Sequence, residues 1–352
     1  MTTRTDIATQ LAPLGWRADL PAARAWAEKS EGRVARVSEQ HRSGYRVCDG
    51  DSEFPVQAPA PWTRKGFPPE QRAVVGDFVR LHAHEDQILE LMPRSSLFQR
   101  GAAGEHLKVQ PIAANIDTVL VVTGLDRDFN LRRLERYLVL VNASGAAPVL
   151  VLTKTDRCED VATLREQLAG IEGGGVPVVA VNAKDAVSLA ALSPWLGPGR
   201  SVVLVGSSGA GKSTLTNTLT GREKMKTGAV RERDSRGRHT TTHRALLTLP
   251  QGACLIDTPG MRELKLTGEE DVADAVFDDI EALACTCRFR DCRHQQEPGC
   301  AVRAALDSGD LDAGRYANYR KLLSERDQAA DVLAARRKQA RSSGPGKPRR
   351  PG

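Results

Sequence analysis

Apolar positions near the start of the chain follow a short-range alternation. From about Gly32 to Pro93, brief runs alternate apolar with polar residues, and Gly, Pro and Asp separate the runs. The runs are centred on Val34 and Val37, Tyr45 and Val47, residues 74–79, and residues 88–91. They predict the short strands of a small antiparallel barrel, although period-two runs of this length also fit other small β folds.

Residues 1–30 precede this region and show a different spacing. Ala22, Trp26 and Ala27 recur at intervals typical of a helix. We therefore expect a helical N-terminal extension, and its pattern indicates no function.

From about Ile112 the pattern changes to near-continuous apolar runs that alternate with helical segments. The expected strands are residues 118–122, 149–152, 176–181, 201–205 and 253–256. An amphipathic helix is expected over residues 130–142. This rhythm predicts an α/β fold whose mostly parallel sheet is covered on both faces.

After about Thr267 the chain becomes charged and helical. We expect an acidic helix over 269–284, a Cys- and His-rich segment, and a charged helix over 313–340. The composition of the final residues predicts a basic disordered tail, which either adds salt-sensitive affinity for RNA or only solubilises the end.

Charge adds a hint about partners. The 352 residues include 50 Lys and Arg against 44 Asp and Glu, a formal net charge of +6. This balance favours a polyanion such as nucleic acid, but an ordinary mixed-charge surface also explains it. No run approaches the roughly 20 apolar residues of a membrane span, and the first residues lack the apolar core of a signal peptide. We therefore expect a cytoplasmic protein without a membrane partner.

One segment, from Gly206 to Ser213, matches the Walker A pattern. It follows the predicted strand 201–205 and opens a predicted helix, which is the context that this motif requires. Its backbone N–H groups and the helix N-terminus would face phosphate oxygens. Lys212 would reach the β- and γ-phosphates, and Ser213 would be a ligand of Mg²⁺. A nucleoside phosphate is thus favoured over a chance glycine-rich turn.

Two downstream segments fit the same site. Asp257 and Gly260 form an Asp-x-x-Gly pattern after an apolar strand. Asp257 would hold Mg²⁺ through water, and the Gly260 N–H would contact the γ-phosphate, although this pattern alone is common in turns. The basic segment 235–243 lies where a switch loop is expected. Thr240 or Thr241 would then be a second Mg²⁺ ligand, unless the segment is an ordinary solvated loop.

The base is indicated upstream, by residues 153–156 (Thr-Lys-Thr-Asp) and 182–184 (Asn-Ala-Lys). Both resemble guanine-recognition motifs, and both follow predicted parallel strands at the end where such sheets bind ligands. The Asp156 carboxylate can accept hydrogen bonds from N1–H and the 2-amino group of guanine, whereas adenine offers neither donor. Lys154 would lie along the base, and the Ala183 N–H would meet O6.

Thr153 departs from the Asn of the common motif. We expect it to lack the amide that ties the base loop to the phosphate loop, while Asp156 keeps the main discrimination.

The base motifs precede the phosphate loop, which is the reverse of the usual order. Because the ends of a compact domain often lie close together, a circular permutation preserves the site. The permuted domain then ends just after the Asp-x-x-Gly switch. We hypothesise that residues 261–266 transmit the γ-phosphate state to the C-terminal module.

Four cysteines crowd together with a histidine near the C-terminus. Cys287, Cys292, His294 and Cys300 form a Cys₃His set suited to a closed, tetrahedral, structural zinc site. Cys285 is an alternative ligand by spacing alone.

Family-specific segments accompany these motifs: residues 129–137 (Phe-Asn-Leu-Arg-Arg-Leu-Glu-Arg-Tyr), 237–242 (Gly-Arg-His-Thr-Thr-Thr) and 287–294 (Cys-Arg-Phe-Arg-Asp-Cys-Arg-His). With them the chain resembles the RsgA family of circularly permuted small ribosomal subunit biogenesis GTPases, over roughly residues 30–335. The resemblance implies an N-terminal OB-fold that binds 16S rRNA, GTP hydrolysis stimulated by the small subunit, a role in late 30S maturation, and the four zinc ligands named above.

Catalysis is expected from Lys212 and, by the resemblance, from His239. Met261 occupies the position after Gly260 where many GTPases carry the glutamine that orients water. A histidine can orient or deprotonate water near neutral pH. His239 equally fits a contact with rRNA or a solvated position.

The expected domains are an N-terminal extension (1–30), an OB-fold (31–105), a permuted GTPase domain (106–266), a zinc module (267–335) and a basic tail (336–352). We expect a monomer that binds GTP and GDP. The alternatives are an RNA-binding module gated by GTP, with hydrolysis as a slow timer, and an ATPase with an RNA adaptor, which Asp156 opposes. The expected nucleotide-binding residues are Thr153, Lys154, Thr155, Asp156, Asn182, Ala183, Lys184, Gly206, Ser207, Ser208, Gly209, Ala210, Gly211, Lys212, Ser213, Thr214, Asp257 and Gly260.

Overall fold

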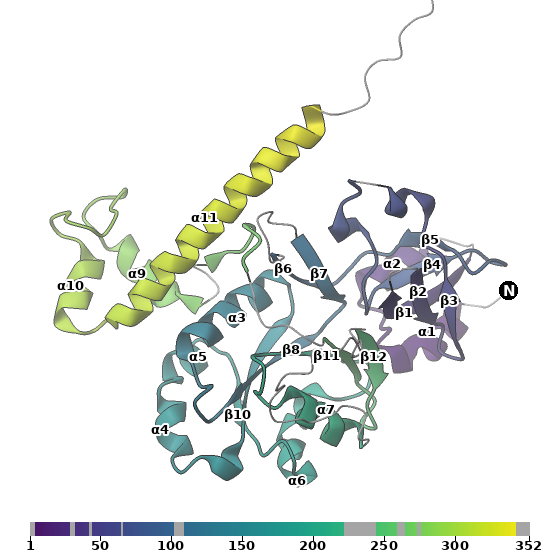
Figure 1. The fold of residues 1–352 in the computed structure, drawn as a ribbon, viewed down its shortest axis with the longest axis horizontal. Helices are drawn as coiled ribbons and strands as arrows, with labels where there is room; N and C mark the ends of the chain where they lie inside the picture. The colour runs from purple at the N-terminus through teal and green to yellow at the C-terminus, as the bar shows by residue number, and fades with distance from the viewer. Residues whose placement is uncertain are drawn as a thin grey trace, which may run out of the picture. The chain divides into compact units, whose positions relative to one another are not determined.

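The computed structural model describes residues 4–28, 32–41, 44–64, 66–101, 109–221, 244–258, 265–272 and 276–342. The chain divides into two compact units (Figure 1). The first unit comprises Met1–Gln99 and Gln110–Leu264, and the second comprises Arg100–Val109 and Lys265–Gly352. The expected residues His239, Thr240, Thr241 and Gly260, and the tail beyond Ser342, lie outside the described residues.

The N-terminal segment is helical, as expected. It forms α1 (Arg4–Leu11), a 3₁₀ turn η1 (Ala12–Leu14) and α2 (Pro21–Ala27). Trp16 packs edge-on against Phe78 of the barrel, with 4.9 Å between the ring centroids. Leu11 and Trp26 are buried in the same apolar cluster, so the segment is part of the first unit's core.

Five strands form the barrel: β1 (Arg33–His41), β2 (Gly44–Cys48), β3 (Glu53–Val56), β4 (Phe78–Leu81) and β5 (Ile88–Leu91). Antiparallel pairing runs in the order β3-β2-β1-β4-β5. A parallel bridge between Gln57 and Gln87 joins β3 to β5 and closes the barrel. This is the five-stranded connectivity of an OB-fold.

The barrel strand expected over residues 74–79 begins only at Phe78. Residues 74–77 form a turn, because the Asp77 N–H donates to the Val74 carbonyl at 3.1 Å and the Val74 N–H donates to the Asp77 carboxylate at 2.8 Å. Gly76 takes a φ of 93° in this turn. A Cβ there would strike the Ala114 carbonyl, so the turn requires glycine.

The sheet expected after residue 112 is mostly parallel. Its parallel strands are β8 (Thr118–Gly124), β9 (Ala147–Thr153), β10 (Val178–Ala180), β11 (Ser201–Val205) and β13 (Cys254–Asp257). The strand order is β10-β9-β8-β11-β13, and β12 (Ala245–Thr248) adds an antiparallel strand beside β13. The carboxyl ends of the parallel strands therefore meet at one edge of the sheet.

Helices connect these strands. They are α3 (Leu131–Ala143), η4 (Thr155–Arg157), α4 (Val161–Glu166), α5 (Ala169–Gly173), α6 (Ala186–Leu189), η5 (Ala190–Trp195) and α7 (Lys212–Thr220). The strands are buried almost throughout; all seven residues of β8, for example, are buried. Burial on both faces explains the continuous apolar runs in the sequence.

The barrel and the GTPase sheet share a strand pairing. β12 pairs with β1 through Glu39 and Ala245, so strands of both form one eleven-stranded sheet. Two further strands, β6 (Leu97–Gly101) and β7 (Val109–Ala114), pair separately.

The second unit contains α9 (Asp278–Cys285), α10 (Ala301–Ser308) and α11 (Ala313–Ser342). Residues 269–271 are not helical, contrary to our expectation of a helix from 269. Instead the buried Glu270 carboxylate accepts hydrogen bonds from the N–H groups of Thr267 and Gly268, at 2.6 and 2.9 Å. α11 also extends to Ser342, so residues 336–342, which we expected to be disordered, are helical. Among the described residues, no helix has the length and apolar character that crossing a membrane requires.

Candidate nucleotide and metal sites

The phosphate loop joins β11 to α7, as the sequence predicts. Gly206 and Gly211 adopt positive φ values of 146° and 100°. A Cβ on Gly206 would collide with the Val122 carbonyl, and one on Gly211 would lie 3.1 Å from the Thr153 hydroxyl. The loop is therefore held tightly between β8 and β9, and only glycine fits at these two positions.

Lys212, the first residue of α7, is folded back over this loop. Its Nζ donates to the carbonyl oxygens of Gly206 and Ser207, at 2.7 and 2.5 Å. Burial lowers the pKa of Lys212 to about 8, and the charges of Asp128 and Asp257 partly oppose this shift. A buried ammonium whose acceptors are two uncharged carbonyl oxygens is suited to bind the negative charge of a phosphate.

Asp257 ends β13 next to the end of β11, since Val203 pairs with Ile256. Burial raises the pKa of Asp257, and the Lys212 charge opposes that rise. Ser213 lies partly buried in the first turn of α7. A carboxylate and a hydroxyl are hard oxygen donors, so this pair fits Mg²⁺.

The first guanine motif follows β9. The buried Thr153 hydroxyl donates to the Ala210 carbonyl at 2.5 Å. We expected that replacing the usual Asn would remove the link to the phosphate loop; this expectation is wrong, because the hydroxyl makes that link itself. Lys154 then takes a left-handed φ of 63°, and its Nζ pairs with Asp126 at 2.5 Å. Thr155 and Asp156 begin η4.

The second guanine motif follows β10 and lies beside the first. Lys184 Nζ lies 4.0 Å from an Asp156 carboxylate oxygen. The Asn182 side chain accepts a hydrogen bond from the Lys184 N–H at 3.1 Å, and the Ala183 carbonyl accepts one from the Thr218 hydroxyl of α7 at 2.7 Å. The structure thus brings both motifs together and ties the second to the helix that carries the phosphate loop.

Sequence reasoning missed two aspartates in this site. Asp126 and Asp128 lie in the loop after β8, where Asp126 pairs with Lys154 and Asp128 accepts a hydrogen bond from the Ser207 hydroxyl. Both aspartates could have been found from the sequence, because their loop follows a predicted strand at the same carboxyl edge of the sheet as the recognised motifs.

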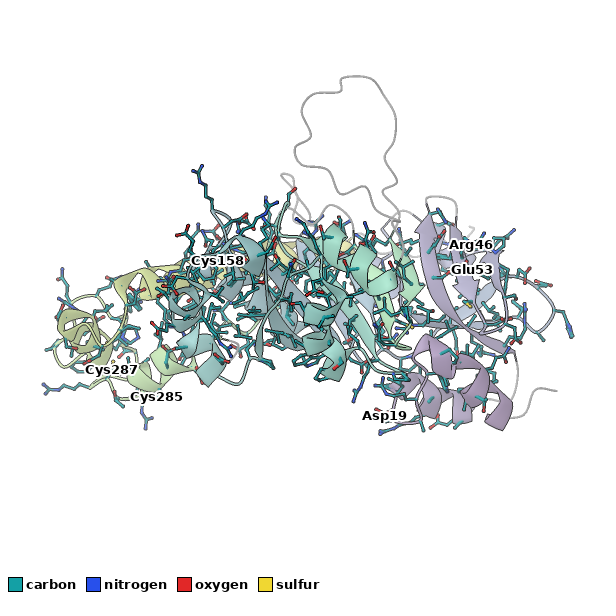
Figure 2. All side chains as sticks on the ribbon, turned by 90° about the horizontal axis from the view of Figure 1, so that it is seen from below. Asp19, Arg46, Glu53, Cys158, Cys285 and Cys287 are labelled. Atoms are coloured by element: carbon teal, nitrogen blue, oxygen red, sulfur yellow. The ribbon has the colours of Figure 1, made fainter. Side chains whose placement is uncertain are left out.

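The Cys/His cluster assembles in the second unit. The ligand atoms of Cys287, Cys292, His294 and Cys300 all lie within 4.8 Å of one another. His294 Nδ1 is 3.4 Å from Cys300 Sγ and 3.6 Å from Cys287 Sγ. Cys285 is exposed and is not part of this group, although it lies near Cys287 at the end of α9 (Figure 2). The four residues could hold one metal ion with no position left open.

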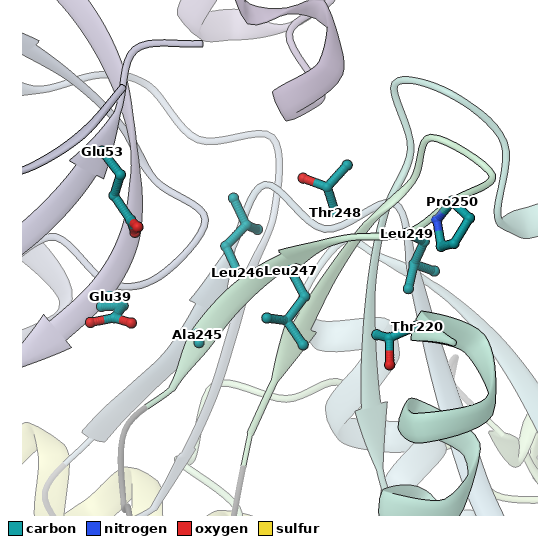
Figure 3. A pocket seen from close by; sticks show the side chains of 9 residues that line it. All are labelled: Glu39, Glu53, Thr220, Ala245, Leu246, Leu247, Thr248, Leu249 and Pro250. Atoms are coloured by element: carbon teal, nitrogen blue, oxygen red, sulfur yellow. The ribbon is translucent and has the colours of Figure 1, made fainter. Parts of the chain in front are cut away.

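A pocket of about 570 Å³ lies along β12 and is distinct from the nucleotide site (Figure 3). Glu39 and Glu53 of the barrel and Thr220 at the end of α7 line it, together with β12 residues. None of the expected nucleotide-binding residues is among its lining residues.

Comparisons with known proteins agree with this geometry. A family model described as RsgA GTPase matches residues 91–267. The small ribosomal subunit biogenesis GTPases RsgA of Xanthomonas axonopodis pv. citri and Xanthomonas euvesicatoria pv. vesicatoria are each 60% identical over 303 residues. Each alignment covers 86% of this chain and 83% of the relative.

Two solved structures share the fold. The crystal structure of YjeQ from Thermotoga maritima matches with a TM-score of 0.60 and 24% identity, over 83% of this chain and 98% of that one. The structure of YloQ, described as a circularly permuted GTPase, matches with a TM-score of 0.59 and 24% identity, over 84% and 95%. The family match and the relatives at 60% identity, which cover most of both chains, show that this chain belongs to the RsgA family of GTPases.

Proposed function

We propose that this chain is a GTPase that binds the small ribosomal subunit, acts late in its maturation, and hydrolyses GTP to GDP and phosphate to drive its own release. The observation that carries the proposal is the convergence of both guanine motifs and the phosphate loop at one sheet edge, joined by the Thr153 to Ala210 hydrogen bond. The names of the relatives at 60% identity supply the ribosomal role.

The base is read by Asp156, whose carboxylate is one-third exposed and so accessible to a ligand. Lys154, Ala183 and Lys184 complete the base site. The phosphates occupy the loop from Gly206 to Ser213, with Thr214 on the first turn of α7. The Asp257 carboxylate interacts with the Lys212 charge, and Lys212 would also face the phosphates. Asp257 would therefore be placed to hold a cation that neutralises phosphate charge.

Lys212 and His239 are the proposed catalytic residues. Lys212 neutralises charge on the transferred phosphoryl group, and His239 orients the attacking water. Ser213, Asp257, Thr240 and Thr241 are the proposed magnesium ligands. When bound, Mg²⁺ supplies further charge neutralisation at the β- and γ-phosphates.

The Cys₃His cluster holds one structural Zn²⁺ in this proposal. Three thiolates and an imidazole are ligands that zinc prefers, and their separations suit one tetrahedral ion. The ion would fix α9, the segment 286–300 and α10 in one arrangement.

The OB-fold barrel binds 16S rRNA in this proposal, and the chain acts as a cytoplasmic monomer. OB-folds commonly bind oligonucleotides over the face of their second and third strands. Arg46 of β2 has 37% of its side chain exposed on this part of the barrel (Figure 2). The Arg46 guanidinium forms an ion pair with the Glu53 carboxylate, at 3.8 Å.

A second candidate function is an RNA-binding module that uses GTP as a conformational ligand, with hydrolysis only as a slow timer. Met261 in the position of the usual glutamine favours it. Turnover measured over many cycles separates the two, since small subunits should accelerate hydrolysis in the first function and leave the slow rate of a timer unchanged.

Binding to purified small subunits tests the proposal. The chain loaded with a non-hydrolysable GTP analogue should co-sediment with small subunits, and the chain loaded with GDP should remain largely free. Asp156→Asn, assayed with xanthosine triphosphate in place of GTP, tests the base assignment, since the amide can donate to the xanthine oxygen. Equal co-sedimentation in both nucleotide states would overturn the proposed release step.

A further inference from the structure

The loop between β8 and α3 carries two aspartates whose partners lie on both nucleotide loops. Asp126 Oδ2 accepts a hydrogen bond from Lys154 Nζ at 2.5 Å. Partial burial disfavours the Asp126 charge, but the Lys154 ammonium and the Asp128 N–H hold the pKa of Asp126 below its usual value. Asp126 is therefore a charged partner of Lys154 in the first guanine motif.

Asp128 connects the same loop to the phosphates. Its Oδ2 accepts a hydrogen bond from the Ser207 hydroxyl, and its Oδ1 accepts one from Arg133 of α3 at 2.7 Å. The Asp128 N–H in turn donates to Asp126 Oδ1 at 3.0 Å. A continuous chain of polar contacts thus runs from Lys154 through both aspartates to Ser207.

Helix capping does not account for these two residues. The N-cap of α3 is Asn130, whose side chain accepts from the Arg133 N–H at 2.9 Å. The preceding backbone also makes room for the pair, since a Cβ on Gly124 would lie 2.9 Å from both Lys154 Nζ and Asp126 Oδ1. The loop therefore contacts both the nucleotide site and, through Arg133, the helix that it starts.

We propose that Asp126 and Asp128 are positioning residues for the guanine nucleotide: Asp126 fixes Lys154 beside the base, and Asp128 fixes Ser207 at the entry of the phosphate loop. The inference rests on the proposed nucleotide site. It adds the loop between β8 and α3 to the guanine motifs and the phosphate loop that form this site. Neither carboxylate contacts the nucleotide in this account; each acts through the side chain that it holds.

Titration of the full chain with a fluorescent GDP analogue at pH 7 tests the inference. Asp126→Asn and Asp128→Asn should each weaken binding at pH 7 by on the order of tenfold, as expected for loss of a charge-assisted contact. Ser207→Ala should also weaken binding, and the loss in the Asp128→Asn, Ser207→Ala double variant should be smaller than the sum of the two single losses, because both variants remove the same contact. Asp160→Asn, which alters the exposed N-cap of α4, is the matched control and should bind like the parent.

The outcomes separate this inference from the proposed function. If the parent chain binds no GDP, the proposed function fails. If the parent binds GDP and both Asp variants bind equally well, or if the losses of Asp128→Asn and Ser207→Ala are strictly additive in the double variant, only the inference fails. Because Asp126→Asn could unfold the loop, Lys154→Gln completes a double-mutant cycle: strictly additive losses would contradict the Asp126 role.

Discussion

The Thr153 hydroxyl lies 2.5 Å from the Ala210 carbonyl oxygen and joins the guanine loop to the phosphate loop. In the sequence these residues are separated by 57 positions, and the base motif comes first. A threonine at the end of β9 thus performs the bridging that the amide of the common motif performs elsewhere.

Thr153→Val should weaken GDP binding about fivefold to tenfold, because a valine of the same shape leaves the buried Ala210 carbonyl without its donor. Equilibrium titration with a fluorescent GDP analogue measures the change. Thr123→Val is the matched control: Thr123 is equally buried at the end of β8, and its hydroxyl has no partner among the described residues. A loss of affinity in the control as large as that in Thr153→Val would contradict the bridging role.

Arg36→Met should lower the free energy of unfolding by about 3 kcal/mol, the scale reported for breaking a buried, hydrogen-bonded charge. The Arg36 guanidinium is wholly buried and donates to the carbonyls of Leu14, Gly76 and Asn115 and to the Ser201 hydroxyl. It therefore links the N-terminal segment, the barrel and the strand that leads to the phosphate loop. Urea denaturation measures the loss.

Arg46→Met is the control for this prediction, because Arg46 lies on the next strand with its side chain partly exposed. Its stability should change by no more than about 0.5 kcal/mol. If Arg36→Met were equally mild, the buried network would contribute no net stability.

Nucleotide affinity should be constant below about pH 8 and fall above it, by up to about tenfold per pH unit. Burial lowers the pKa of Lys212 from 10.5 to about 8 in the free protein. Phosphates favour the protonated amine, so binding above pH 8 must take up a proton. Stability changes in the opposite sense: the unfolded chain keeps this proton to higher pH, so the Lys212 contribution to the free energy of unfolding rises from pH 8 toward 10.5.

Isothermal titration of GDP in two buffers with different ionisation enthalpies checks this directly. Proton uptake near pH 8.5 that disappears at pH 6.5 supports the account. Proton release across the whole range would be inconsistent with it.

Removing the metal should unfold the second unit and leave the first intact. A chelator, or Cys300→Ser, should remove about one equivalent of zinc. Either change should also abolish the helical signal of α9 and α10, because Cys300 also caps α10. Elemental analysis and circular dichroism report the two effects. Cys285→Ser is the control, and a loss of zinc in that variant would move Cys285 into the ligand set.

Sequence pattern predicted the elements that are buried on both faces. β8, β9 and β11 appear as apolar runs because no residue in their centres meets water. β12 was not predicted, since three of its residues are only partly buried, Thr248 is exposed, and the four show neither alternation nor a continuous apolar run of strand length. β3 contains Pro55, which conceals a short edge strand.

Contacts that depend on the tertiary fold could not be predicted from the sequence. Arg36 appears as an exposed position of a strand, because nothing near it in sequence supplies its four acceptors. The Thr153 hydroxyl and the Asp126–Asp128 loop acquire their roles only when strands from distant segments meet at one edge. The Cys₃His set was predictable because its spacing is local.

The most direct test of the account is GTP turnover over many cycles, measured with and without purified small ribosomal subunits. We expect slow hydrolysis by the chain alone and at least tenfold faster multiple turnover with subunits, since the missing glutamine leaves the water to be oriented by other groups. Lys212→Ala should abolish the stimulated rate. If saturating small subunits bind the chain but do not raise its rate of GTP hydrolysis, the central claim is contradicted.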